Sequence, residues 1–262
     1  MTIAQAVLLF VAALWAGAQN SVAGGGSFIT FPALVVSGVT VINANATSTV
    51  ALWPGTVASV GAYRRELRTV PYLGILGIIS LIGGWLGAIL LLHTSSSTFS
   101  RLIPVLLLGA TLLFAFGPSF TAWLKRRKAA EAPPSDQTPG RSTAAVVGMC
   151  VGQAVIAVYG GYFGGGIGIL MLAAFGLMGM ENIHAMNALK TLLASCINGV
   201  AVVTFIIAGA VEWPQAVVML VGGIVGGYGG AAYARRLDPG LVRRIVLVVA
   251  ILMTAYFFIR AL

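Results

Sequence analysis

The stretch Pro71–Leu92, PYLGILGIISLIGGWLGAILLL, decides the class of fold. It contains 22 consecutive residues without a charge, and its apolar residues are continuous rather than alternating with polar ones. A helix needs about 20 residues to cross the hydrocarbon core of a bilayer, whereas a strand of a membrane barrel alternates between apolar and polar positions. The stretch therefore predicts a transmembrane helix.

The rest of the chain has the same character. Of its 262 residues, only 15 are basic and 6 acidic, and 59% are hydrophobic. A water-soluble protein of this size could not bury so much apolar surface, which excludes a soluble enzyme, a secreted disulfide scaffold and a disordered chain. Ten spans of about 20 residues would use most of the chain, so we predict an all-α polytopic membrane protein without a soluble domain. Cys150 and Cys196 lie in apolar runs with no metal or disulfide spacing, and we predict neither a metal site nor a cofactor.

Short motifs recur at a nearly constant distance along the chain. The offset grows slowly from 140 to 143 positions, which a chance match between glycine-rich segments would not do. Such self-similarity predicts two copies of one structural unit. The matches are Gly24-Gly25-Gly26 with Gly164-Gly165-Gly166, Asn45-Ala46 with Asn187-Ala188, Thr49 with Thr191, Pro71 with Pro214, Gly83-Gly84-Trp85-Leu86-Gly87-Ala88 with Gly226-Gly227-Tyr228-Gly229-Gly230-Ala231, Arg101 with Arg244, and Thr111 and Phe114 with Thr254 and Phe257.

Each copy is predicted to hold five helical elements. The first transmembrane repeat covers residues 1–123 and the second covers 143–262, and the polar segment 124–142 between them is predicted to be a cytoplasmic linker. The first helix is expected to be retained rather than cleaved as a signal peptide, because no Lys or Arg precedes its apolar run. The predicted elements are 3–20, 27–37, 43–63, 71–92 and 101–123, then 143–160, 167–179, 183–208, 214–234 and 241–261.

An odd number of elements per copy predicts inverted repeats, and the charges agree with this. The loop after the third element carries Arg64, Arg65 and Arg68 in the first copy. In the second copy that loop carries only Glu212, whereas the loop after the fourth element is now the basic one, with Arg235, Arg236, Arg243 and Arg244. Placing the basic loops and the linker in the cytoplasm follows the positive-inside rule and puts both termini outside. The net positive charge of the chain is then explained by its orientation in the membrane, and we predict no nucleic-acid partner.

Both glycine runs are predicted to interrupt a helix. At membrane depth, exposed backbone groups are tolerated only against protein or a wet cavity, and the N-terminus of the following helix offers free N–H groups to an anion. Tight helix packing through small residues is the alternative, but paired interruptions in inverted repeats favour a substrate site. Each pair of short helices forms either two short spans or a re-entrant hairpin. The candidate residues here are Asn20, Gly24, Gly25, Gly26, Ser27, Gly164, Gly165 and Gly166.

The third elements carry polar side chains along one helical face. Interhelical hydrogen bonds, worth about 0.6 kcal/mol each, explain residues such as Ser59 and Ser195. Ligand contact is an equally good explanation for the two asparagines that open these helices. The faces comprise Asn45, Thr49, Thr56 and Ser59 in the first copy and Asn187, Thr191, Ser195 and Asn198 in the second.

Lys190 is the most informative single residue. It lies about two turns into an apolar helix, where a lysine costs roughly 2.5–3.5 kcal/mol. Its side chain could reach the inner surface, but Asn187 and Thr191 lie beside it and no acid lies within the same helical turn, which suggests an anionic ligand. His184 and His93 fit interfacial positions, and His184 is near enough to Lys190 to be a candidate for ion coupling.

Several of these motifs together resemble the sulfite exporter TauE/SafE family of membrane transporters. The resemblance rests on Ala16-Gly17, Asn20, Ala23-Gly24-Gly25-Gly26-Ser27, Thr30 and Pro32, followed by Asn45-Ala46-Thr47-Ser48, and on the return of this module from Gly164. It implies export or uptake of sulfite, organosulfonates or other small sulfur-containing anions across the bacterial cytoplasmic membrane, and it adds Thr30 to the candidate residues. In the second copy Ile167 and Leu172 replace the equivalents of Ser27 and Pro32, so the two half-sites are unequal.

These observations predict a secondary transporter, most simply an exporter, of a small sulfur-containing oxyanion. The site would lie between the repeats, which would alternate its access by rocking, with a proton or sodium ion as coupling ion and with assembly into homo-oligomers as an option. No Walker A motif is present, so direct coupling to ATP is not expected. An anion channel of the same architecture is the alternative. An intramembrane enzyme using Ser27 and His184 is a weaker one, because no Gly-x-Ser-Gly type site is present and a serine nucleophile needs a base held against it.

Overall fold

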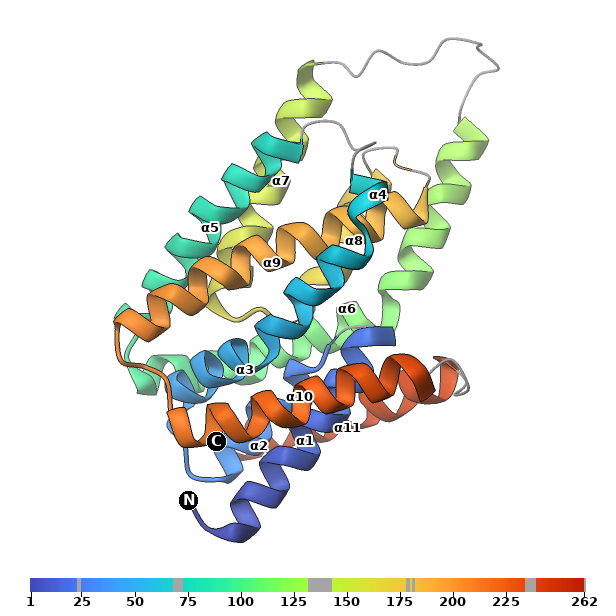
Figure 1. Cartoon of the computed structure of the whole chain (residues 1–262). Coiled ribbons are helices and arrows are strands. Elements are labelled where there is room, and N and C mark those ends of the chain that lie inside the picture. Colours follow the sequence, from blue (N-terminus) through green and yellow to red (C-terminus); the bar gives the residue numbers. More distant parts are fainter. Residues whose placement is uncertain are drawn as a thin grey trace.

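The described part of the chain is entirely helical. A computed structural model describes residues 1–22, 25–67, 73–131, 143–177, 180, 182–233 and 239–261, and no strand occurs among them. The helices are α1 (Ile3–Val22), α2 (Ser27–Val36), α3 (Val41–Ala62), α4 (Arg64–Leu67), α5 (Leu73–His93), α6 (Ser96–Glu131), α7 (Thr143–Tyr162), α8 (Ile167–Leu177), α9 (Ile183–Ile207), α10 (Trp213–Tyr233) and α11 (Pro239–Ala261) (Figure 1). This confirms the all-helical fold class.

Each of the ten predicted elements corresponds to one of these helices. Two differences matter. The single turn α4 directly follows α3, where only a loop was expected. Helix α6 continues beyond residue 123 to Glu131, into the segment predicted as linker, because its Lys, Arg and Ala residues are strong helix formers.

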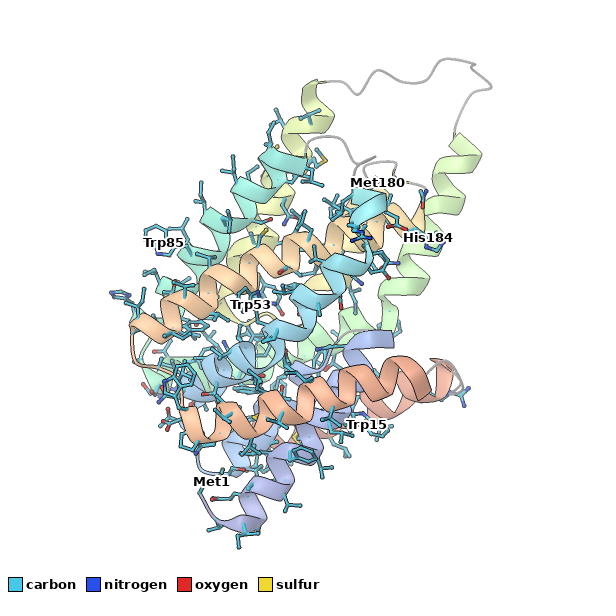
Figure 2. The ribbon with its side chains drawn as sticks, viewed as in Figure 1. Met1, Trp15, Trp53, Trp85, Met180 and His184 are labelled. Carbon is cyan, nitrogen blue, oxygen red and sulfur yellow. The ribbon has the colours of Figure 1, made fainter. Side chains whose placement is uncertain are left out.

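The helices have the length and surface of membrane spans. Ile3–Asn20, Leu73–His93 and His184–Ile207 are each long and apolar enough to cross a bilayer. Shorter apolar segments occur in α2, α6, α7, α8, α10 and α11. Large apolar side chains point outward from these helices, and Trp85 is one of them, at 48% exposed (Figure 2). An apolar outer surface of this extent suits contact with lipid, and the chain is a multi-pass membrane protein.

Helices from the two halves of the chain pack against each other in an exchanged pattern. Helix α1 lies along α10, and α5 lies along α7, so the first predicted element of each half packs on the fourth predicted element of the other (Figure 1). The third helices, α3 and α9, contact each other directly, as do α6 and α11. Helix α2 contacts α11, and α8 contacts α6.

Glycines permit the closest of these contacts. A Cβ atom on Gly226 of α10 would collide with the backbone carbonyl of Leu14 in α1. A Cβ atom on Gly87 of α5 would collide with the backbone carbonyl of Val158 in α7. Small residues that let two backbones approach are a main source of helix association in membranes, so these glycines fix the framework on both sides of the molecule.

Aromatic side chains hold the short helix α2 inside this framework. Phe31 stacks on Phe257 of α11 with ring centroids 5.8 Å apart, and it meets Phe163 edge-on at 6.0 Å. Phe28 and Phe31 are both 1% exposed. The beginning of α2 therefore has a fixed position in the centre of the molecule.

Candidate functional site

The first glycine run forms a turn between α1 and α2. Gly25 has a φ of 90°, which favours glycine. The backbone N–H of Gly26 donates to Oδ1 of Asn20 at 2.8 Å, so a side chain from the end of α1 holds the turn. Gly24 lies outside the described residues.

The second glycine run forms the corresponding turn between α7 and α8. Gly164 and Gly166 both have a φ of 77°. The hydroxyl of Tyr159 donates to the carbonyl of Gly165 at 2.7 Å and holds this turn from α7. Both predicted helix interruptions are thus present, and each is followed by a short helix, α2 or α8.

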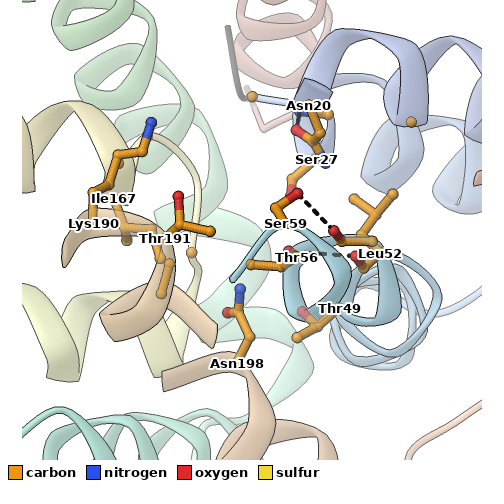
Figure 3. A pocket seen from close by; sticks show the side chains of 18 of the residues that line it. Asn20, Ser27, Thr49, Leu52, Thr56, Ser59, Ile167, Lys190, Thr191 and Asn198 are labelled. Atoms are coloured by element: carbon orange, nitrogen blue, oxygen red, sulfur yellow. Dashed lines mark hydrogen bonds between the residues drawn. The ribbon is translucent and has the colours of Figure 1, made fainter. Parts of the chain in front are cut away.

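A cavity of about 320 Å³ lies between the two turns and the third helices. Figure 3 shows Lys190 and Thr191 on one side of this space and Asn20, Ser27 and Ser59 on the other. Of the residues predicted from the sequence, the cavity is lined by Asn20, Gly25, Gly26, Ser27, Thr49, Gly164, Gly166, Asn187, Lys190, Thr191 and Asn198. The structure therefore brings most of the predicted residues to one place.

Lys190 is the charged group of this cavity. Its ammonium donates to Oδ1 of Asn187 at 3.0 Å, and its methylene stem lies over Gly168 in the first turn of α8. Among the described residues, no carboxylate lines the cavity. The cavity thus has a net positive charge in the part of the chain that the structure describes.

Two asparagines of the cavity lining have donor groups available to a ligand. Oδ1 of Asn20 is occupied by the N–H of Gly26, and Oδ1 of Asn187 is occupied by Lys190. The remaining NH₂ group of each amide can only donate hydrogen bonds. A ligand that accepts hydrogen bonds is therefore a better match to these amides than one that donates.

The hydroxyl groups of two cavity threonines already donate hydrogen bonds within their own helices. Thr49 donates to the carbonyl of Asn45 and Thr191 donates to the carbonyl of Asn187, each at 2.8 Å along its own helix. A hydroxyl has one hydrogen to donate, so these two threonines must rotate to bind an anion. Lys190 and the amides of Asn20 and Asn187 can donate to a ligand without such a change.

Comparison with known proteins identifies the family. The chain matches the family described as "Sulfite exporter TauE/SafE" over residues 9–257, nearly its whole length. It belongs to the sulfite exporter TauE/SafE family. This confirms the resemblance noted in the sequence, and it means that the protein is a membrane transporter and not an enzyme.

The curated relatives of this TauE/SafE protein are bacterial. "Probable membrane transporter protein YfcA" of Escherichia coli (strain K12) is 28% identical over 249 residues, which cover 95% of this chain and 87% of the relative. "Probable membrane transporter protein" of Haemophilus influenzae is 26% identical over 250 residues, covering 95% and 92%. "Probable membrane transporter protein ORF9" of Sinorhizobium sp is 26% identical over 244 residues, covering 93% and 88%. No solved structure matches the chain significantly.

Four predicted residues of this family member lie outside the cavity lining. Thr30 is completely buried and its hydroxyl pairs with that of Ser48 at 2.6 Å. Asn45 is 4% exposed and donates to the carbonyl of Tyr162 in the other half of the chain at 3.1 Å. Gly165 belongs to the turn but does not line the cavity. His184 is exposed at the beginning of α9 (Figure 2).

The cavity also contains residues that sequence reasoning did not select. Gly168 and Leu172 from α8, Leu52 and Tyr63 from the third helix of the first half, and Gly223 from α10 all line it. Apolar and glycine residues of this kind are common throughout a membrane protein, so nothing in the sequence distinguishes them. Thr56 and Ser59 line the cavity too. The prediction of an interhelical hydrogen bond at Ser59 is wrong, because its hydroxyl donates to the carbonyl of Gly55 in the same helix at 2.9 Å.

Proposed function

We propose that the protein is a secondary transporter that exports a small sulfur-containing oxyanion, such as sulfite or an organosulfonate, through the cavity around Lys190. The observation that carries this proposal is the position of Lys190, which lines the cavity without a carboxylate among the described lining residues. A lysine at membrane depth marks a substrate or ion pathway by default. The free amide donors of Asn20 and Asn187 support an anion over a cation.

The N-terminus of α8 strengthens this electrostatic argument. The stem of Lys190 lies over Gly168, the second residue of α8. The first turn of a helix carries a partial positive charge, so a cation there is unfavourable and an anion is favourable. An oxyanion bound between Lys190 and this helix end would interact well with both, which supports the same place as the binding site.

Two contacts support a twofold relation between the predicted repeats. Thr111 and Thr254, which are 143 positions apart, share a hydrogen bond of 3.3 Å between α6 and α11. The indole N–H of Trp53 donates to the carbonyl of Ser195, 142 positions later, at 3.1 Å. Equivalent residues meet each other near a twofold axis, and the opposite charge bias of the equivalent loops supports an axis in the membrane plane, as inverted repeats require.

The contacts of α3 support alternating access. Its beginning is tied to the second half of the chain, because Asn43 donates to Oε1 of Glu212 at 3.0 Å and Thr47 accepts from the N–H of Glu212 at 3.0 Å. Its end lines the cavity through Ser59 and Tyr63. Rocking of one half against the other would break the contacts at the beginning of α3 and close the space at its end.

The same proposal places the protein in the bacterial cytoplasmic membrane with the Arg64 end of α3 in the cytoplasm. The linker 124–142 is then cytoplasmic and both termini are outside. A gradient of protons or sodium ions would supply the driving force.

A flux assay in liposomes tests this function. Purified protein should exchange labelled sulfite, sulfate, thiosulfate or methanesulfonate against an unlabelled pool, and an imposed proton or sodium gradient should drive accumulation of the preferred anion. Lys190→Ala should abolish this flux, whereas Arg244→Ala, which removes an exposed charge from α11, should retain it. Flux without counterflow or accumulation would instead identify an anion channel, and full flux in Lys190→Ala would overturn the site.

A further inference from the structure

The stem of Lys190 lies against Gly168 in α8. A Cβ atom placed on Gly168 would be 3.2 Å from Cδ, 3.8 Å from Cγ and 3.9 Å from Cε of Lys190. All three of these atoms belong to Lys190, so a side chain at position 168 would press on the lysine stem. The stem of Lys190 therefore packs on Gly168 while its ammonium donates to Oδ1 of Asn187.

Gly168 is not required by the backbone. It lies inside α8, one residue after Ile167, and it is not among the glycines with positive φ. Glycine in a helix is less stable than alanine because it loses more conformational freedom on folding. The backbone conformation does not require a glycine at position 168, and the stem of Lys190 lies against it. This points to a requirement for space at that position.

We propose that Gly168 is a positioning residue for anion recognition, because its missing side chain sets where the ammonium of Lys190 stands relative to Asn187 and the first turn of α8. This inference rests on the proposed function of the cavity. A methyl group at 3.2 Å is tighter than an ordinary contact, so the flexible stem must move by a few tenths of an ångström. The ammonium at its end then shifts relative to Oδ1 of Asn187 and to the first turn of α8.

The test is a graded substitution series, Gly168→Ala and Gly168→Val, measured by sulfite and methanesulfonate uptake in proteoliposomes. Gly148→Ala in α7 is the matched control, since a Cβ atom there meets nothing within 4 Å. Gly168→Ala should raise the concentration for half-maximal uptake about three- to tenfold with the maximal rate retained, as coupling between residues in contact predicts. Gly168→Val should raise it further, and Gly148→Ala should leave it unchanged.

Lys190→Ala, assayed beside the series, separates this inference from the proposed function. If wild type carries neither anion, or if Lys190→Ala transports as wild type does, the proposed function fails and this inference with it. If Lys190→Ala abolishes uptake but both Gly168 variants keep the wild-type half-saturation concentration, only the positioning role of Gly168 is overturned. A fall in the maximal rate with half-saturation unchanged would also overturn it, because Gly168 would then act on movement of α8 and not on binding.

Discussion

The contact between the third helix and the short second helix is built differently in the two halves of the molecule. In the first half, Ser48 of α3 bonds Thr30 of α2, and both hydroxyls are buried. In the second half, the position 142 residues after Ser48 is Lys190, which lies over Gly168 of α8 and lines the cavity. The hydroxyls of Thr30 and Ser48 bond to each other and so hold two helices together. Lys190 over Gly168 instead leaves a charge available to a ligand.

The two asparagines that open these helices differ in the same direction. Asn45 is buried, and its amide NH₂ group donates to the carbonyl of Tyr162 across the interface between the halves. Asn187 lines the cavity, and its Oδ1 accepts a hydrogen bond from the ammonium of Lys190. Under the proposed function, one half would supply mainly framework at this level and the other would supply recognition, although both begin from similar motifs.

The largest effects should appear where the two halves are alike. Gly226→Ala and Gly87→Ala each place a methyl group against a backbone carbonyl, which cannot move aside as a side chain does. Overpacking of this kind typically costs about 1–3 kcal/mol, and a backbone collision belongs at the upper end. Both variants should lose most of the folded protein recovered by size-exclusion chromatography. Gly109→Ala, where a Cβ atom meets nothing within 4 Å, should behave as wild type; equal recovery of all three would show that the glycine contacts do not fix the framework.

The next largest effect separates Asn187 from Asn45. Asn187→Ala should weaken anion binding about tenfold or more, because the partner of Lys190 is lost, while thermal stability in detergent changes little. Asn45→Ala should do the reverse and lower the thermal midpoint, since it removes a buried hydrogen bond between the halves. Equal effects of the two variants on binding would mean that the half-sites are equivalent.

A smaller effect is expected at Ser48. Ser48→Ala removes a hydrogen bond within the protein that is worth about 0.6 kcal/mol in membrane proteins, and Thr30 keeps its second bond to the carbonyl of Gly26. The thermal midpoint should fall slightly and anion uptake should be retained. A loss of uptake comparable to that of Lys190→Ala would place Ser48 in the transport pathway.

The smallest effect is expected at His184. Its side chain is exposed at the start of α9 and does not line the cavity. His184→Gln should therefore change the rate of uptake and its dependence on pH between pH 5 and 8 very little. A flattened pH profile would instead assign proton coupling to this residue.

Much of the fold could be predicted because a bilayer imposes strict rules on sequence. Continuous apolar runs such as Leu73–His93 indicate helices, and recurring glycine motifs indicated the interruptions that precede α2 and α8. The continuation of α6 to Glu131 was missed because the charges there suggested a linker, although they also favour a helix. Charge in a sequence does not by itself separate a helix beyond the membrane from a loop.

The site could be predicted in part, for a related reason. Polar residues such as Lys190 and Asn198 stand out in an apolar chain, and the cavity contains both. Whether a polar residue faces a cavity or a neighbouring helix depends on packing that one sequence does not reveal, which is why Thr30 and Asn45 were grouped with the rest although both are buried. Gly168 carries no signal at all, because its importance lies in the neighbour that covers it.

Whether Lys190 holds the anion can be measured by equilibrium binding of sulfite and methanesulfonate to the purified protein. The wild type is compared with Lys190→Ala and Ser48→Ala. Removing a charged hydrogen-bond donor costs about 1.5–3 kcal/mol, so Lys190→Ala should weaken binding at least about tenfold while Ser48→Ala binds as wild type does. Undiminished binding by Lys190→Ala would contradict the account, because the second half of the molecule would then not hold the anion.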